Sequence, residues 1–259
     1  MLGRPVAFIT GGAAGIGLAF AHHWISEGGH AVLADLDSDA LQAALAGLPD
    51  GTARGVTCDV TDANSVDTAI DTVLKTEGRL DTVLNSAGIA RPETSADISD
   101  AAFATMLDIH VTGSMRVCRA AHRAFAGRGG TIVNVASVAA LSGMPRRASY
   151  TAAKAAIGGL TRTLAVEWGR EGIRVNAIAP GYVRTALTDV LISEGKLDDR
   201  PIRARTALGR FAEPEEIASV VHFLATPSSS YVNGHTLVVD GGLTVDGNWY
   251  PETDGSPLT

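Results

Sequence analysis

A glycine-rich turn restricts the fold of this chain more than any other stretch. Residues 6–10 read Val-Ala-Phe-Ile-Thr, which has the length of a buried strand, and residues 18–27 have a helical pattern. Between them stands Gly11-Gly-Ala-Ala-Gly15-Ile-Gly17. Glycines let such a turn approach a pyrophosphate, which then binds the unpaired N–H groups where the helix begins. Alternatively, the glycines serve only the tight turn, which needs them with or without a ligand.

Short apolar runs alternate with helical patterns along the rest of the chain. This alternation is typical of a parallel sheet with helices on both faces. It predicts an α/β fold in a single doubly wound domain that spans residues 1–259. Further strands are predicted at 31–35, 55–60, 80–84, 131–136, before 176 and at 234–240, with helices at 62–77, 99–127, 150–170 and from 213 onwards.

Composition excludes several classes of protein. The net charge of -7, without a polybasic run, argues against nucleic acid or an anionic membrane as a partner. Cys58 and Cys118 lie in apolar segments and are expected to be reduced, buried thiols. The chain passes from its N-terminus directly into a strand, and no apolar run reaches the roughly 18 residues of a membrane span. A cytoplasmic location is therefore expected.

Two histidines early in the chain invite a metal-binding interpretation. His22 and His23 fall inside the first predicted helix, and no carboxylate or cysteine nearby has metal-ligand spacing. They are expected to be surface or packing residues, and no metal site is predicted.

Asp35 ends the second predicted strand, 18 residues after Gly17. A carboxylate there accepts hydrogen bonds from both ribose hydroxyls of an adenosine and repels a 2′-phosphate. Leu36 follows where a phosphate-binding arginine would otherwise stand, so the sequence favours NAD over NADP. The alternative is a carboxylate that caps the next helix, a role that Asp37 or Ser38 can also fill.

Tyr150 and Lys154 lie four residues apart in an Ala-rich stretch with a helical pattern. That spacing places a phenol and an ammonium on one face of the helix. Because a free phenol has a pKa of roughly 10, a nearby ammonium is needed to lower it toward the working range of a general base. Such pairs also occur on solvated helices without any catalytic role.

Polar residues also follow later strands at their carboxyl ends. Asp59 ends the third predicted strand, and Asn85 and Gly88 follow the fourth. Ligands of parallel sheets bind beyond these ends, so these residues are expected along the adenine and the back of the cofactor. Ser137 follows the fifth strand and is expected to hold a substrate oxygen, or merely to begin the next loop.

Together these residues occur in the order and spacing of the short-chain dehydrogenase/reductase family, which the chain resembles over about residues 4–242. The resemblance implies a seven-stranded Rossmann sheet, a homotetramer or homodimer, and hydride transfer at a carbon that bears oxygen. It also implies that Thr185 bonds the nicotinamide amide. The cofactor contacts expected on these grounds are Gly11, Ala14, Gly15, Ile16, Gly17, Asp35, Asp59, Val60, Asn85, Ala87, Gly88, Tyr150, Lys154, Pro180, Gly181, Val183 and Thr185.

His110 departs from the family's pattern. The family usually has an asparagine at this place, where it holds a water in the proton relay from lysine to solvent. Imidazole can also shuttle protons near neutral pH, which predicts an inflection in the pH profile near the reference pKa of about 6.5. Alternatively, a neutral His110 only fills a kink in the helix.

Residues 184–212 carry an uneven mixture of charges and resemble the family's mobile substrate lid. Together with Arg146 and Arg147, a basic lid favours an anionic substrate or an acidic carrier protein, unless these charges are simply solvated. The tail 243–259 is not expected to be helical. In the family such tails often reach a neighbouring subunit, although a disordered end is the alternative.

The expected reaction is oxidation of a secondary alcohol by NAD, with a small-molecule alcohol or ketone as substrate. Tyr150 serves as the base, Lys154 lowers its pKa and binds the nicotinamide ribose, and Ser137 orients the oxygen. A 3-oxoacyl thioester reductase is the second enzyme hypothesis, although that activity usually uses NADPH. A cofactor-binding sensor or scaffold without turnover is the alternative from another class.

Overall fold

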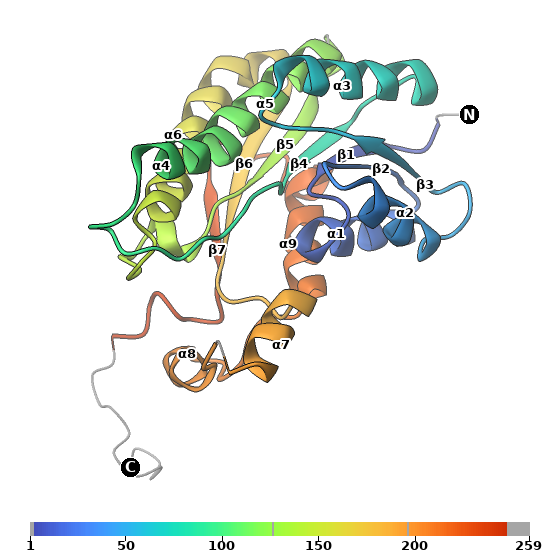
Figure 1. Cartoon of the computed structure of the whole chain (residues 1–259). Coiled ribbons are helices and arrows are strands. Elements are labelled where there is room, and N and C mark those ends of the chain that lie inside the picture. Colours follow the sequence, from blue (N-terminus) through green and yellow to red (C-terminus); the bar gives the residue numbers. More distant parts are fainter. Residues whose placement is uncertain (1–2, 126, 196, 248–259) are drawn as a thin grey trace.

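In the computed structural model, which describes residues 3–125, 127–195 and 197–247, seven parallel strands form one sheet. Their order is β3-β2-β1-β4-β5-β6-β7, so the chain winds outward from β1 in one direction and from β4 in the other (Figure 1). The predicted α/β fold with a seven-stranded Rossmann sheet is therefore confirmed. The strands are β1 (Val6–Thr10), β2 (His30–Asp35), β3 (Ala53–Thr57), β4 (Thr82–Asn85), β5 (Gly130–Val135), β6 (Ile173–Pro180) and β7 (Thr236–Val239).

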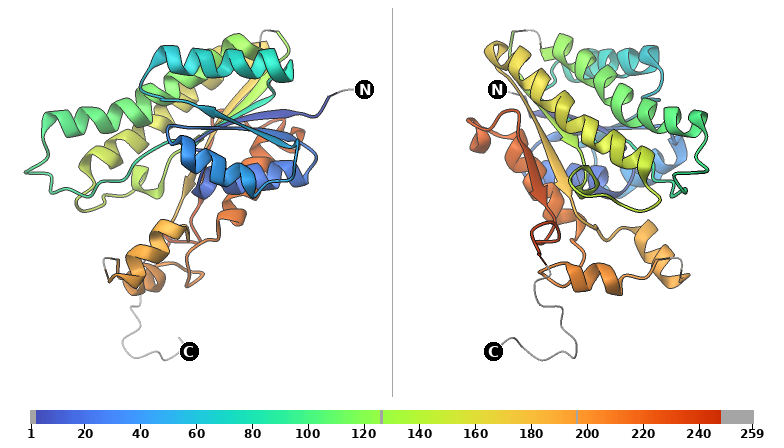
Figure 2. Two further views of the ribbon diagram at one scale, coloured as in Figure 1. Left: turned by 45° about the vertical axis from the view of Figure 1, so that its right-hand side comes forward. Right: turned by 90° about the vertical axis from the view of Figure 1, so that its left-hand side faces the viewer.

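Helices cover both faces of the sheet (Figures 1 and 2). One face packs against α3, α5 and α6, and the other against α1, α2 and α9, with a separate buried apolar cluster on each side. Because each inner strand is buried on both faces, it is apolar almost throughout rather than alternating. The α-helices are α1 (Gly15–Ser26), α2 (Ser38–Ala46), α3 (Ala63–Glu77), α4 (Asp100–Leu107), α5 (Gly113–Phe125), α6 (Ala148–Trp168), α7 (Ala186–Ser193), α8 (Arg200–Arg205) and α9 (Pro214–Ala225).

Most strand bounds differ from the predicted ones by one to three residues, and two of the differences bear on the site. The third strand ends at Thr57, so Asp59 belongs to the following loop. It does so because the Asp59 carboxylate accepts hydrogen bonds from the backbone and the hydroxyl of Thr61, which turns the chain away from β2. The segment 176–181, expected after the sixth strand, instead lies within β6 as far as Pro180.

The single helix predicted at 99–127 is also wrong. A π-helical turn, Asp108–Thr112, separates α4 from α5. Its one inward-facing buried side chain, His110, reaches the backbone of Ile89, and such an anchor accompanies the wider turn.

The segment 184–212 contains α7 and α8, which project beyond the sheet in both views of Figure 2. Of the predicted tail, 248–259 lies outside the described residues. Both cysteines are buried and free, as expected. Within the described ranges no helix is long and apolar enough to cross a bilayer.

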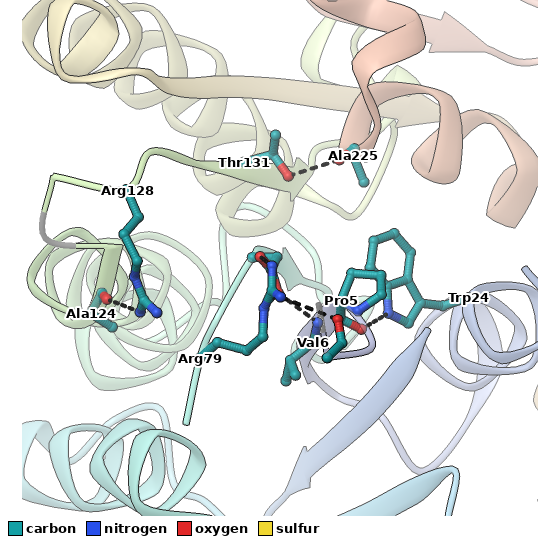
Figure 3. Close-up of polar contacts among 10 residues, drawn as sticks. Pro5, Val6, Trp24, Arg79, Ala124, Arg128, Thr131 and Ala225 are labelled. Atoms are coloured by element: carbon teal, nitrogen blue, oxygen red, sulfur yellow. Dashed lines mark hydrogen bonds and ion pairs between the residues drawn. The ribbon is translucent and has the colours of Figure 1, made fainter. Parts of the chain in front are cut away.

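At the end of the sheet where the parallel strands begin, hydrogen bonds hold neighbouring segments together (Figure 3). The Asp81 carboxylate accepts from the backbone of Val6 at 2.7 Å and from Arg79 at 2.8 Å. The Trp24 indole donates to the Pro5 carbonyl at 3.2 Å, which ties α1 to the start of β1. Ligands of parallel sheets bind beyond the carboxyl ends of the strands, so the ligand site is expected at the other end of the sheet.

Candidate active site

The glycine turn after β1 is shaped to receive an anion. Gly11 and Gly15 have φ angles of 63° and 54°, which residues with a side chain rarely adopt. A Cβ on Gly17 would lie 2.3 Å from the Gly11 carbonyl oxygen. The N-cap residue of α1, Ala14, has no side chain that can cap, and the first turn has no acidic residue. The N–H groups at this helix start therefore suit a pyrophosphate.

A cavity of about 560 Å³ opens beside the glycine turn, at the ends of β2 and β3. The Asp35 carboxylate lines it and is oriented by two backbone donors, Ala13 at 3.2 Å and Asp37 at 3.3 Å. The cavity is lined by Gly11, Ala34, Asp35, Leu36, Asp37, Cys58, Asp59, Val60, Thr61, Ala87, Gly88, Ile89 and Ile109.

The neighbouring carboxylates settle which acid caps α2. Asp37 accepts from the backbone of Asp39 and Ala40, both at 3.0 Å, so it fills the cap. Asp35 is left facing the cavity. Asp37, although it caps the helix, also lines this space, as do Asp35 and Asp59, and no lysine or arginine is among its described lining residues.

Asn85 does not line the cavity. Its amide is buried between β4 and β5, where its Nδ2 donates to Asn134 Oδ1 at 2.8 Å and lies 3.3 Å from the Cys118 sulfur. Asn134 in turn donates to Thr161 on α6 at 3.0 Å. This buried polar cluster, which the sequence did not indicate beyond Asn85 itself, joins the sheet to the helix that carries Tyr150 and Lys154.

Tyr150, Lys154 and Ser137 are brought together where β5 ends and α6 begins. The Lys154 ammonium donates to the Val135 carbonyl at 2.6 Å and lies 5.6 Å from the centre of the Tyr150 ring. Ser137 accepts from the backbone of Ala139 at 3.1 Å. All three side chains thus lie at one rim of the sheet, as expected from their spacing.

Burial dominates the titration of these groups. It raises the pKa of Tyr150, while a hydrogen bond with Ser137 and the Arg147 guanidinium act to lower that pKa. Burial also lowers the pKa of Lys154 to about 8. Ser137 and Arg147 thus act against the effect of burial on the Tyr150 pKa, and a lowering of that pKa by Lys154 stays a prediction.

A second cavity of about 260 Å³ lies on the other side of the glycine turn. Several expected cofactor residues line it together with Ser137 and Tyr150. The lining residues are Ile16, Ala90, Val135, Ala136, Ser137, Val138, Met144, Arg147, Tyr150, Pro180, Gly181, Tyr182, Val183 and Thr188.

Thr185 lies next to Gly15 of the glycine turn, where a Cβ added to Gly15 would be 3.8 Å from Thr185 Cγ2. It is the N-cap residue of α7, and its hydroxyl accepts from the backbone of Thr188 at 3.2 Å, while the Thr185 amide donates to the Thr188 hydroxyl at 2.7 Å. Thr185 and Gly15 line a common cavity. Thr185 therefore joins the start of the lid segment to the glycine turn.

His110 is buried behind this site. Its Nε2 lies 3.1 Å from the backbone nitrogen and 2.9 Å from the carbonyl oxygen of Ile89, while its Nδ1 is buried without a partner in the described chain. The ring meets the Tyr150 ring edge-on at 5.6 Å. Burial and the charge of Lys154 lower the pKa of His110 to about 4, so the imidazole is neutral at physiological pH.

Sequence reasoning missed several residues of the site. Tyr182, Val138 and Met144 wall the substrate side, and Ile89 anchors His110. Tyr182 directly follows Gly181, so its place after β6 was a usable signal. The other positions depend on how loops fold back over the sheet. Among the described residues, no group of His, Cys, Asp or Glu side chains is suited to a metal ion.

Comparisons with known proteins agree with this geometry. A family profile described as Enoyl-(Acyl carrier protein) reductase matches residues 11–244. Short-chain reductase protein NovJ of Streptomyces niveus is 41% identical over 92% of this chain and 94% of that protein. D-threitol dehydrogenase of Mycolicibacterium smegmatis is 38% identical over 94% of each. The crystal structure of gox2181 has a TM-score of 0.89 at 36% identity, covering 94% of this chain and 97% of that one.

The chain therefore belongs to the short-chain dehydrogenase/reductase family. Its relatives include dehydrogenases named for sugar alcohols and a diol. This protein is accordingly an oxidoreductase that acts on secondary alcohols or ketones, with a nicotinamide cofactor, NAD or NADP, as hydride carrier.

Proposed function

We propose that this enzyme is an NAD-preferring dehydrogenase of secondary alcohols. The carboxylates around the adenosine-side cavity carry this proposal, because Asp35 can accept from ribose hydroxyls while a 2′-phosphate would meet negative charge and no cation. Gly11, Gly15 and Gly17, with the uncapped start of α1, would hold the pyrophosphate, and Asp59, Val60, Ala87 and Gly88 would surround the adenine side.

In the proposed reaction a secondary alcohol loses its hydroxyl proton to Tyr150 and a hydride to NAD⁺, which gives a ketone, NADH and one proton. Ser137 orients the substrate oxygen, and Lys154 holds the nicotinamide ribose. Oxidised nicotinamide, when bound, supplies the hydride acceptor and a positive charge near Tyr150. That charge adds to Ser137 and Arg147 in favouring the phenolate that burial disfavours.

His110 is proposed to support the proton path as a neutral group. Nε2 can donate to the Ile89 carbonyl or accept from the Ile89 amide, so the ring stays anchored in either tautomer. The partnerless Nδ1 is then free to accept or donate, which suits a relay water. Because the pKa is about 4, the inflection expected near 6.5 is revised downward, and the profile above pH 5 should not report His110.

The proposal includes a single domain, with 184–212 as a lid over the substrate, and a cytoplasmic location. A homotetramer or homodimer is supported by large apolar side chains exposed on the outer elements, among them Val166 on α6, Tyr231 before β7 and Val238 on the edge strand. Light scattering of the purified protein measures the assembly directly.

The second enzyme hypothesis, reduction of a 3-oxoacyl thioester on an acidic carrier, loses support from the lid. Four of its arginines pair with acids of the lid or of the adjoining α9, in the pairs Arg184–Asp189, Arg200–Asp198, Arg203–Asp199 and Arg210–Glu216. These pairs reduce the positive charge that the lid offers to a large acidic partner.

Cofactor preference is the test of the proposal. We expect kcat/KM for NAD to exceed that for NADP by about tenfold or more on any alcohol turned over, because one carboxylate near a phosphate costs at least that factor. Asp35→Asn should narrow the ratio by raising the NADP value. Asp50→Asn, on an exposed turn far from the cavity, serves as the control. Equal use of both cofactors by the unmodified enzyme would contradict the assignment.

A further inference from the structure

Arg147 is an arginine without a partner on the substrate side. It is half-buried at the start of α6, and it lines the cavity that also contains Ser137 and Tyr150. No hydrogen bond or ion pair joins its guanidinium to another described residue, and the other described arginines whose guanidinium lacks such a partner are all exposed. A half-buried guanidinium without a counter-charge is unfavourable, and an anionic ligand would remove that penalty.

The backbone before Arg147 is held in an unusual conformation. Arg146 has a φ of 62° and is the one non-glycine residue of the described ranges with a positive φ. Its carbonyl accepts from the Glu93 amide at 2.9 Å. Strained backbone of this kind persists only where its surroundings fix it, and here it sets the direction of Arg147.

A second arginine lines the adjoining cavity. Arg205, on α8, borders a space of about 220 Å³ whose other walls are apolar or uncharged. This cavity shares Val138, Met144 and Tyr182 with the cavity of Tyr150, so the two are adjacent.

Arg205 differs from the neighbouring lid arginines. Arg200 and Arg203 on the same helix are each paired with an aspartate, whereas Arg205 has no partner in the described chain. No carboxylate is among the described lining residues of either substrate-side cavity. Two guanidiniums, that of half-buried Arg147 and that of exposed Arg205, are thus available to a ligand.

We infer that the substrate is a small anionic secondary alcohol or its ketone, whose carboxylate, sulfonate or phosphate is held by Arg205 and Arg147 while its carbinol faces Tyr150. The inference rests on the proposed NAD-linked oxidation and narrows it. A guanidinium fits such planar or tetrahedral oxyanions through paired hydrogen bonds. Cavities of this size suit a short molecule.

The test compares substrates that share a carbinol and differ in charge. We would measure kcat and KM with NAD for 3-hydroxybutyrate and its methyl ester, and for 2-hydroxypropane sulfonate and 2-hydroxypropyl phosphate. We expect the preferred anion to exceed the ester in kcat/KM by about tenfold or more. That ratio should fall in Arg205→Met, mainly through KM, and should persist in Arg200→Met, which removes a fully ion-paired arginine of the same helix.

Arg147→Met gives an independent reading because Arg147 also lowers the Tyr150 pKa. We expect a higher KM for the anion together with a pH profile of kcat displaced toward alkaline pH, since Tyr150 loses a stabilising positive charge. A merely structural role would leave the profile in place.

The outcomes separate the two proposals. Equal kcat/KM for acid and ester, or equal losses on both in Arg205→Met, overturns the anionic substrate and leaves NAD-linked alcohol oxidation standing. A panel in which NADP supports turnover as well as NAD does overturns the proposed function instead, whichever substrate is preferred.

Discussion

The cavity at the ends of β2 and β3 and the cavities beside Tyr150 are lined by side chains of opposite charge. On the adenosine side, Asp35, Asp37 and Asp59 line the cavity without a described cation. On the substrate side, Arg147 and Arg205 line the cavities without a described carboxylate. The acids come from strand ends and the first loops after them, whereas the arginines come from a loop before α6 and from the lid.

This difference indicates how selectivity is divided. The acidic end is built on the sheet, and its carboxylates accept hydrogen bonds from backbone donors that fix them. Under the proposed function this end would select the cofactor. The basic end depends on segments that vary readily without disturbing the sheet. Tyr150, Ser137 and Lys154 lie where the two ends meet.

The largest effect should come from a substitution at the junction, which is the place where the acidic and basic ends meet at Tyr150, Ser137 and Lys154. Tyr150→Phe removes the ionisable oxygen with little change in volume, so kcat should fall by roughly 10²- to 10⁴-fold. Affinities for NADH and for the substrate, measured by fluorescence titration, should stay within a few-fold. Substantial residual turnover would show that Tyr150 is not the base. A lost affinity for NADH or for the substrate would show that Tyr150 also contributes to binding.

Lys154 allows a test of intermediate size, based on stability. Its pKa falls from 10.5 to about 8 on folding, so between these values the unfolded chain holds a proton that the folded chain has released. Folded wild-type protein therefore gains stability as pH rises through this window, and below pH 8 the burial penalty is complete. Lys154→Met has no such dependence.

Urea unfolding of both proteins at pH 7 and 9.5 measures this difference. The stability of wild type relative to Lys154→Met should rise by about 2 kcal/mol between these pH values. If the difference in unfolding free energy between wild type and Lys154→Met is the same at both pH values, burial does not lower the pKa of Lys154. Lys75→Met, on the surface of α3, is the matched control.

The smallest effect concerns a contact between the acidic cavity and the junction. Gly88 lines that cavity, and a Cβ added to it would lie 2.2 Å from His110 Cε1. Gly88→Ala should therefore destabilise the protein by about 1–3 kcal/mol by overpacking. In His110→Asn, whose side chain is shorter, the same change should cost less than about 0.5 kcal/mol. If urea unfolding shows the same destabilisation by Gly88→Ala in wild type and in His110→Asn, the overpacking does not arise from the imidazole.

Much of the cofactor half was predictable from sequence because backbone geometry dictates its residues. A strand-to-helix turn that approaches a phosphate needs glycine at fixed places, and Asp35 follows from the end of β2. Tyr150 and Lys154 were predictable because helical spacing alone places them together. The fold followed from the alternation of strands and helices.

The remaining features depend on contacts between distant segments. Asn85 looked like a cofactor residue, yet its amide turns inward because Asn134 on the adjacent strand offers a partner. The pKa of His110 follows from its burial and from Lys154, which no local pattern reveals. Likewise, the lack of partners for Arg147 and Arg205 appears only when the loops are folded.

The π-helical turn at Asp108–Thr112 also makes this segment sensitive to changes in chain length. A helix advances about 100° per residue, so deleting one residue here would restore regular winding while rotating all of α4 by that angle relative to α5. His110 would leave the interior even though its identity was unchanged. Substitutions at 108–112 therefore test side chains, whereas insertions and deletions test the register on which the interior position of residue 110 depends.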